Sequence, residues 1–193
     1  MLMLLFSSCI NTDDGESQSV ASNVHDVTKY AEYSESKVYI IIQGEKLCTS
    51  LTTLNLSGMN ISDEEMQLLA YLVYLESLRI SNAQISNVAS LSKLLNLKEL
   101  RLGWNQISDL TPLANLTSLK HLHLEHNQID DLTPLADLIN LDRMILSNNQ
   151  INDLTPLASL RNLRILELHD NEINDLKPIN SLRNLRELDL SDN

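Results

Sequence analysis

The side chains best suited to chemistry lie close together, because His121, His123, Glu125 and His126 fall within six positions. Alternate residues of an extended strand share one face, so the first three would project together, and His169 follows further along the chain. Imidazole and carboxylate groups can ligate transition metals. Residues two apart on a flat strand diverge, however, and the sequence shows no partner that would orient such ligands. We therefore predict no metal site; the histidines are either pH-sensitive surface groups or ordinary exposed polar residues.

The sequence contains none of the short patterns that mark a catalytic or cofactor site. A hydrolase elbow, a phosphate-binding loop, a paired-cysteine metal signature and a dinucleotide fingerprint are all missing. We predict that the chain is not an enzyme and needs no cofactor. An enzyme whose catalytic domain follows Asn193 is the alternative left open.

The elements that position these residues repeat along the chain. Residues 97–107 follow the pattern L-x-x-L-x-L-x-x-N-x-I, whose apolar positions recur from residues 51, 75, 97, 119, 141, 163 and 185, the last time incompletely. In the first two repeats Met59 and Ala83 replace the asparagine. The spacing is 22 residues after a first step of 24. A fixed period of this length with this pattern is typical of leucine-rich repeats. For residues 51–193 we predict an α/β solenoid. This is a right-handed leucine-rich repeat superhelix with a parallel β-sheet on its concave face and mostly short 3₁₀ returns on its convex face.

Two kinds of connection link the predicted strands. Ser62 to Glu65 has the form of a capping box before an α-helix, which accounts for the 24-residue step. Later connections carry Asp-Leu-Thr-Pro-Leu-Ala or a looser version of it, at residues 109–114, 131–136, 153–158 and 175–179. We expect the proline at the first position of a short 3₁₀ turn, with the preceding threonine as its cap.

Within each repeat the residue types divide by role. The strand leucines, such as Leu100 and Leu102, should face inward, while Gly103 and its polar neighbours face outward. The asparagine that follows lies where the chain leaves the strand, and its amide can satisfy turn backbone groups that would otherwise be buried without a partner. We therefore assign a structural ladder to Asn105, Asn127, Asn149, Asn171 and Asn193.

The outward-facing strand positions vary between repeats, and they are the candidate binding surface. Trp104, the only tryptophan, should lie beside His126 of the next repeat, while Ile145 and Ile165 are apolar where solvent is expected. Exposed aromatic and apolar side chains amid polar ones are typical of interface hot spots, although scattered exposed apolar residues are also common. We predict a protein-binding patch centred on these four residues and His123. The complete predicted partner-binding set is Glu99, Arg101, Trp104, His121, His123, Glu125, His126, Arg143, Ile145, Ile165, Glu167 and His169.

The chain before the repeats divides into three segments. Residues 1–9 are an apolar run ending in Phe-Ser-Ser-Cys, which resembles the end of a bacterial lipoprotein signal peptide. The resemblance implies cleavage before Cys9 and a lipid on its thiol, so that the protein is anchored to a membrane; the alternative is an apolar N-terminus with an incidental cysteine. Residues 10–37 form a polar tether and lead-in, with either a weak helix or an ordered lead-in over residues 20–37. Residues 38–50 form an N-terminal cap that contains a strand over residues 38–42 and a buried Cys48.

The charge and hydrophobicity of the chain exclude two classes of function. The net charge is −12, and the sequence shows no basic stripe, so we predict no nucleic-acid partner. No stretch of about 20 apolar residues occurs, so the sequence predicts no membrane-spanning helix.

Residues 38–193 resemble the internalin-type leucine-rich repeat domains of bacterial surface proteins. The resemblance rests on the 22-residue period, the Asp-Leu-Thr-Pro-Leu-Ala returns, and the phrases at residues 54–58 and 188–193. It implies binding of another protein, sometimes a host receptor, through the concave face, and with Cys9 it implies a location at the bacterial cell surface. An intracellular regulator resembling the repeat subunit of a nuclear protein phosphatase is the alternative. Because the pattern stops within a repeat, we expect the chain to continue beyond Asn193.

Overall fold

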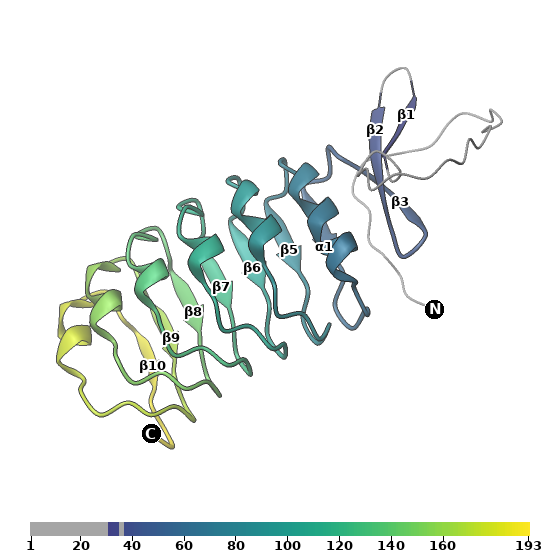
Figure 1. Ribbon diagram of the computed structural model, residues 1–193. Helices are drawn as coiled ribbons and strands as arrows, with labels where there is room; N and C mark the ends of the chain where they lie inside the picture. The colour runs from purple at the N-terminus through teal and green to yellow at the C-terminus, as the bar shows by residue number, and fades with distance from the viewer. Residues whose placement is uncertain (1–30, 35–36) are drawn as a thin grey trace.

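The computed structural model describes residues 31–34 and 37–193, and its repeats form one elongated solenoid (Figure 1). The signal segment predicted over residues 1–9, including Cys9, lies outside the described residues, as does most of the predicted tether and lead-in.

Seven short parallel strands, one from each repeat, form a sheet along the solenoid. Neighbouring strands pair in sequence order, and each residue lies opposite its equivalent in the next repeat, as Leu78 pairs with Leu100 and Leu100 with Leu122. The prediction of a leucine-rich repeat solenoid with a parallel sheet is confirmed. The strands are β4 (Thr53–Asn55), β5 (Ser77–Arg79), β6 (Glu99–Arg101), β7 (His121–His123), β8 (Arg143–Ile145), β9 (Ile165–Glu167) and β10 (Glu187–Asp189).

The repeated leucines form one continuous hydrophobic core between the sheet and the returns. In the central repeats these side chains are completely buried, as Leu100, Leu122 and Leu166 show. Each repeat covers the apolar residues of its neighbours, which is how a solenoid obtains a core without a globular shape. On the terminal strand β10 the equivalent Leu188 is 43% exposed.

A three-stranded antiparallel sheet precedes the first repeat, formed by β1 (Ala31–Ser34), β2 (Lys37–Ile42) and β3 (Glu45–Cys48). Strand β2 agrees with the strand predicted over residues 38–42. The helix predicted over residues 20–37 is wrong where the structure describes it, because β1 pairs with the free edge of β2 and backbone pairing overrides a weak helical spacing. Ile40, Ile42 and Cys48 are buried against the first repeat.

The connection after β4 is the helix α1 (Asp63–Leu68), which continues into the 3₁₀ helix η2 (Leu69–Tyr71). The predicted capping box is confirmed, since Ser62 Oγ accepts from Glu65 N at 3.2 Å and Glu65 Oε2 accepts from Ser62 N at 3.0 Å. Glu65 also accepts hydrogen bonds from Gln43, in the turn between β2 and β3, and so joins the cap to the first repeat. Burial raises the pKa of Glu65, but the hydrogen bonds from Ser62 and Gln43 outweigh this effect and hold it below its ordinary value.

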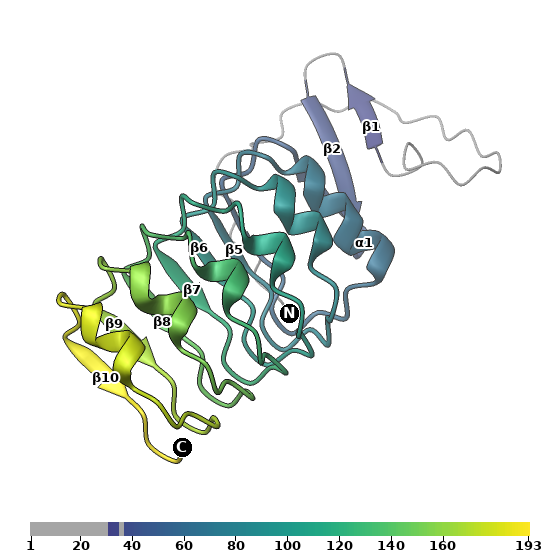
Figure 2. The ribbon, with the colours of Figure 1, turned by 60° about the vertical axis from the view of Figure 1, so that its left-hand side comes forward.

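The later returns are short 3₁₀ helices on the side of the solenoid opposite the sheet (Figure 2). They are η3 (Ala89–Lys93), η4 (Thr111–Leu113), η5 (Thr133–Leu135), η6 (Thr155–Ser159) and η7 (Lys177–Ser181).

The predicted role of threonine in these returns is wrong. Threonine is the first residue of η4, η5 and η6, and proline is the second. The upstream aspartate holds the start of the turn instead, as Asp109 Oδ1 accepts from Thr111 N at 2.8 Å. In η7 the same bond forms with Lys177 N, because the donor is a backbone N–H and does not require threonine. In the threonine turns the hydroxyl adds a second bond, and the two lower the pKa of Asp109.

Candidate binding surface

The asparagines at the end of each strand are held by backbone groups of two adjacent repeats. Asn149 Nδ2 donates to Leu124 O at 3.0 Å and to Leu146 O at 2.9 Å, and its Oδ1 accepts from Ile129 N at 3.0 Å. Asn105, Asn127, Asn171 and Asn193 make the equivalent bonds. The hydrogen-bonding groups of these amides are satisfied by backbone groups of the solenoid. The binding surface therefore lies elsewhere.

The outward side chains of the strands form two rows across the sheet, which we call the strand face. One row contains Ser77, Glu99, His121, Arg143 and Ile165, and the other contains Arg79, Arg101, His123, Ile145 and Glu167. Most of the predicted partner-binding residues therefore do lie side by side. The structure adds Ser77 and Arg79, which the sequence analysis did not single out.

The predicted exposure of Ile145 is wrong. Its side chain is only 5% exposed, although it points outward from β8. His123 and Glu167 flank it in register on the adjoining strands, and Arg143 crosses beside it to pair with Glu167 at 2.9 Å. Longer polar neighbours thus cover the isoleucine, and it packs beneath the surface. Ile165 is partly buried.

Gly103 also departs from the prediction, because it is buried although it points outward. The carboxylate of Glu125 lies directly over its Cα, in the space where any other residue would place a Cβ. Glu125 Oε2 is buried without a hydrogen-bond partner within the described part of the chain. Glycine at this position therefore lets Glu125 lie flat on the sheet.

Ion pairs neutralise part of the strand face. Glu99 accepts from Arg101 Nε at 2.6 Å, from Arg79 at 3.1 Å and from Ser77 Oγ at 3.2 Å. Burial raises the pKa of Glu99, but the hydrogen bond and charge of Arg101 and the charge of Arg79 outweigh it and leave the pKa lowered. Two arginines share one carboxylate, so this part of the face, between β5 and β6, keeps a net charge of +1.

His123 lies between two cations and stays neutral well below neutral pH. Partial burial disfavours its charged form, and the positive charges of Arg101 and Arg143 add to this effect, so the pKa of His123 falls to about 4. His169, by contrast, pairs with Asp170 at 2.8 Å, on a repeat away from the other histidines. In residues 31–34 and 37–193 no three His, Cys, Asp or Glu side chains are grouped so that they could hold a metal ion.

We expect NMR to show the His123 ring titrating with a midpoint near pH 4. Because this folded-state pKa lies below the unfolded-state value of about 6.5, the unfolded chain binds the proton first as the pH falls. The contribution of His123 to stability is complete above about pH 6.5 and is lost on the way to about pH 4, by roughly 1 kcal/mol after allowance for solvent exposure.

Urea unfolding of His123→Gln across this pH range should lack that part of the pH dependence seen for the unmodified protein. Identical pH profiles for the two proteins, or an NMR midpoint near 6.5, would contradict the placement of His123 between the two arginines.

One position in every repeat has a left-handed backbone, with φ between 53° and 74°. Five of the seven residues there tolerate this conformation, namely Gly58, Asn82, Asn148, Asp170 and Asp192. The other two are Trp104, at φ 60°, and His126, at φ 53°. Histidine adopts this conformation more readily than most side chains, whereas tryptophan is an outlier there. Such outliers persist where the surrounding structure holds them, often at functional sites.

The two exceptions touch each other. The rings of Trp104 and His126 stack, with centroids 3.5 Å apart and an angle of 25° between their planes. Trp104 nevertheless remains 57% exposed. The stacked pair lies at the rim of the strand face, where the backbone leaves β6 and β7. The sequence predicted that Trp104 and His126 lie side by side, but their left-handed backbone conformation was not predicted. The Gly, Asn and Asp residues at the equivalent positions of the other repeats indicate that conformation.

Among the described residues, none of the helices is long and apolar enough to span a bilayer.

A parallel sheet of seven equivalent strands, with an amide ladder and 3₁₀ returns, defines a leucine-rich repeat solenoid. Family models described as leucine-rich repeats match residues 47–70, 74–115, 95–137 and 181–193. Among proteins with curated functions, none matches the chain by sequence.

Solved structures similar to this chain include three bacterial leucine-rich repeat proteins. Internalin C2 from Listeria monocytogenes is 34% identical, with a TM-score of 0.58 over 77% of this chain and 79% of that one. An internalin (inlF) from the same species is 29% identical, with a TM-score of 0.67 over 75% of this chain and 50% of that one, so this chain spans half its length. A Leptospira interrogans leucine-rich repeat protein is 26% identical, with a TM-score of 0.60 over 72% of this chain and 43% of that one. The chain belongs to the internalin-type leucine-rich repeat family.

Proposed function

We propose that this chain binds another protein through the strand face and its rim, with the Trp104–His126 stack as the anchor. The observation that carries the proposal is the strained Trp104 stacked on His126, at a position that elsewhere holds Gly, Asn or Asp. Tryptophan gains a stacking contact with His126 at this position, but asparagine would adopt the left-handed backbone with less strain. A residue retained at a cost to the fold, and more than half exposed, is therefore assigned to binding.

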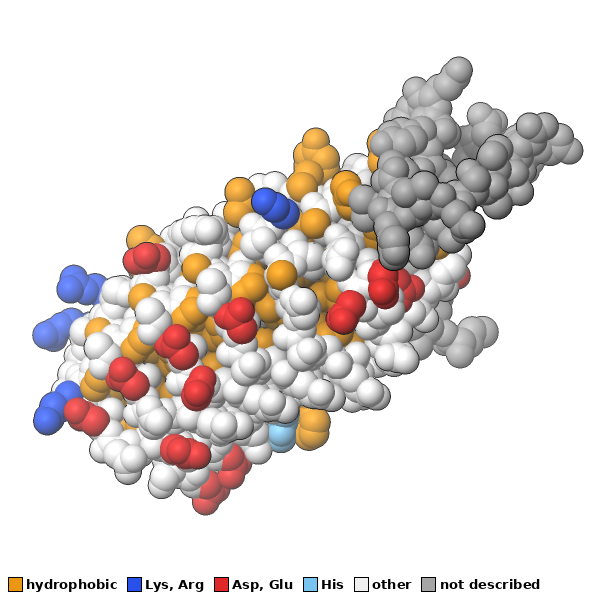
Figure 3. Space-filling model, in the orientation of Figure 1, with side chains coloured by type: hydrophobic (Ala, Val, Ile, Leu, Met, Phe, Trp, Pro, Cys, Tyr) orange, Lys and Arg blue, Asp and Glu red, His pale blue; other side chains and the backbone are white. Residues whose placement is uncertain are grey.

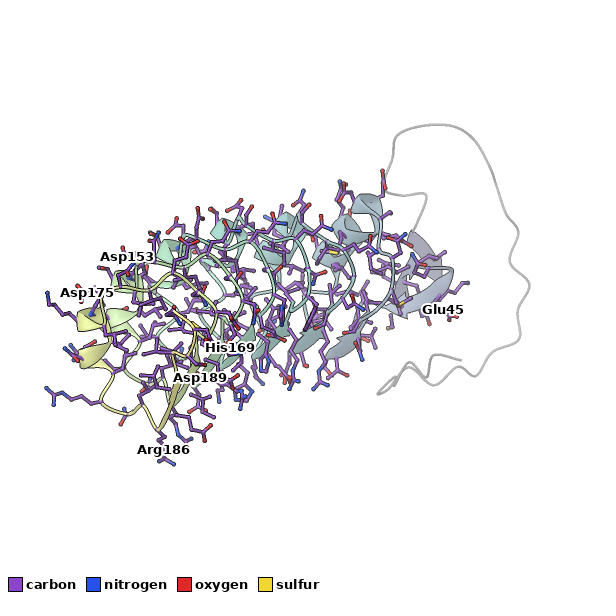
Figure 4. The ribbon with its side chains drawn as sticks, turned by 90° about the horizontal axis from the view of Figure 1, so that it is seen from below. Glu45, Asp153, His169, Asp175, Arg186 and Asp189 are labelled. Atoms are coloured by element: carbon purple, nitrogen blue, oxygen red, sulfur yellow. The ribbon has the colours of Figure 1, made fainter. Side chains whose placement is uncertain are left out.

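The charges of the face indicate what kind of partner fits. Beyond β8 the outward positions become acidic, at Glu167, Asp170, Glu187, Asp189 and Asp192. Figure 4 shows Asp189 on this part of the solenoid beside His169. Hydrogen bonds from Ser191 lower the pKa of Asp189, so it stays ionised at neutral pH. The partner we propose inserts an apolar contact at Trp104 and presents a basic patch roughly 15–20 Å away, three to four strand spacings along the sheet.

We further propose that the chain acts at a bacterial cell surface by binding rather than by catalysis, held by a lipid on Cys9. The support is the Phe-Ser-Ser-Cys sequence at residues 6–9 together with membership of the internalin-type family. A lipid at this position would leave the strand face free to meet a partner.

The anchor is tested by radiolabelled palmitate. Bacteria expressing the full chain should label the protein and retain it in the membrane fraction, because the diacylglycerol placed on the Cys9 thiol carries the labelled acyl chains. Cys9→Ala should abolish the label and release the protein, whereas Cys48→Ala is the matched cysteine control and should keep the label. An unlabelled wild-type protein would overturn the surface anchor.

The binding proposal is tested by capture. The wild-type chain and the double variant Trp104→Asn/His126→Asn are immobilised in parallel and exposed to the same surface-protein extract. A partner should be recovered by the wild type and depleted on the double variant, since the variant keeps the fold and loses the anchor. Equal recovery of every bound protein by both chains would exclude the stack as a binding site.

A further inference from the structure

A groove beside the strand face, with which it shares His121, carries a charge opposite to that of the whole protein. It has a volume of about 480 Å³ and lies at the edge of the sheet where strands β7 to β10 begin. Its lining includes Lys120, Asp142, Arg164 and Arg186, each of which immediately precedes a strand, with His121 at the start of β7. Three cations and one carboxylate give this groove a positive charge on a chain whose net charge is −12.

A second row of asparagines, missed in the sequence analysis, forms the other wall of the groove. Asn140, Asn162 and Asn184 each donate one hydrogen bond from Nδ2, at 2.8 Å, to the backbone carbonyl of the residue 23 positions earlier. An amide nitrogen carries two hydrogens, so each of these side chains is fixed in place with a second donor to spare. Because the amides are already ordered, a ligand would bind them at little entropic cost.

The cations of the groove are only partly used by the protein. Arg164 pairs with Asp142 at 3.3 Å, whereas Lys120 and Arg186 have no ion pair within residues 37–193. In the preceding repeat the equivalent Lys98 is different, because Glu76 neutralises it at 2.8 Å and it does not line the groove. Arg186 projects from the body of the protein (Figure 4). The face drawn in Figure 3 instead shows Asp and Glu side chains along the solenoid.

We propose that this groove binds the phosphate or sulfate groups of an anionic saccharide chain. Ammonium, guanidinium and amide N–H groups are the donors that such oxyanions accept from. The groove crosses four strands, roughly 15 Å, which suits an extended ligand better than a single ion. Asp142 divides the cations, so the ligand carries spaced anionic groups and not a continuous run of charge. The lining has no aromatic side chain besides the His121 imidazole, so it lacks the stacking platform that single-stranded nucleic acids use.

The site is separate from the proposed protein-binding anchor, and its test uses the full chain with probes of known composition. Isothermal titration calorimetry compares a sulfated heparin hexasaccharide, phosphorylated maltohexaose and neutral maltohexaose. We expect one or both anionic probes to bind, with the stronger of the two identifying the natural group, and the neutral sugar to give no heat. The double variant Lys120→Gln/Arg186→Gln should bind about tenfold more weakly, because two cations without internal partners are lost.

The matched control is Lys98→Gln, which removes one cation of the same row outside the groove. It should leave the affinity within about twofold, and circular dichroism should show all variants folded, since the substituted side chains are exposed. Equal weakening by Lys98→Gln would show general charge attraction and overturn the site. Absence of binding by both anionic probes, or tighter binding of a thymidine oligonucleotide, would overturn it as well.

Discussion

Replacing Asn149 with alanine is expected to lower the free energy of unfolding by about 3 kcal/mol. The side chain satisfies the carbonyls of Leu124 and Leu146 and the N–H of Ile129, which belong to two repeats and lie inside the solenoid. Alanine leaves the Ile129 N–H without a partner, at a cost of about 1–3 kcal/mol. Leu124 O and Leu146 O each lose one of two bonds, at about 0.5–1.5 kcal/mol each, because Asn127 and Asn171 still donate to them. Urea denaturation followed by circular dichroism measures the change.

Asn162→Ala is the control for this experiment. Asn162 is an exposed amide with one backbone bond, to Ile139 O at 2.8 Å, so its loss should cost no more than about 1 kcal/mol. If both substitutions destabilise the protein equally, the amide ladder at the strand ends has no special role. A small effect of Asn149→Ala would mean that water enters and replaces the side chain.

Trp104→Asn is expected to weaken partner binding by about 30-fold or more while leaving the protein at least as stable as before. Loss of a central aromatic anchor costs about 2 kcal/mol or more of binding free energy. Asparagine relieves a left-handed backbone that costs a large residue about 1–3 kcal/mol, against about 0.5–1.5 kcal/mol of stacking lost with His126. Biolayer interferometry with the captured partner and urea unfolding of the free chain measure the two effects.

The matched control is Ile139→Asn, which removes another exposed apolar side chain, 52% exposed, from a turn outside the strand face. Its affinity should stay within about threefold of the wild type. A change under about threefold for Trp104→Asn would remove Trp104 from the interface. A clear loss of stability in that variant would show instead that the stack serves the fold.

These opposite effects follow from the way a repeat protein divides its residues. The core leucines and strand-end asparagines are repeated because every layer needs them. Trp104 and His126 differ from the residue types found at this position in the other repeats, and the core does not require them. They therefore identify the anchor more strongly than the charged residues do. Arg79 and Arg101 are largely occupied with Glu99, and Arg143 with Glu167.

The sequence by itself determined the period, the parallel sheet, the buried positions such as Leu100 and Leu122, and the capping box at Ser62. These features depend on residues near one another in the chain, or on a pattern repeated every 22 positions, so they can be read without coordinates.

Only the tertiary structure decided which outward side chains are accessible and what charge they carry. Ile145 is buried, His123 is neutral and Gly103 lies beneath Glu125, because side chains from the repeats before and after reach across them. The anionic net charge likewise concealed the cationic groove, whose charged members follow one another at steps of 22 residues from Lys120 to Arg186 and meet only when the strands stack. A one-dimensional pattern assigns each residue to a face, but contacts between repeats determine how the side chains on that face cover and charge one another.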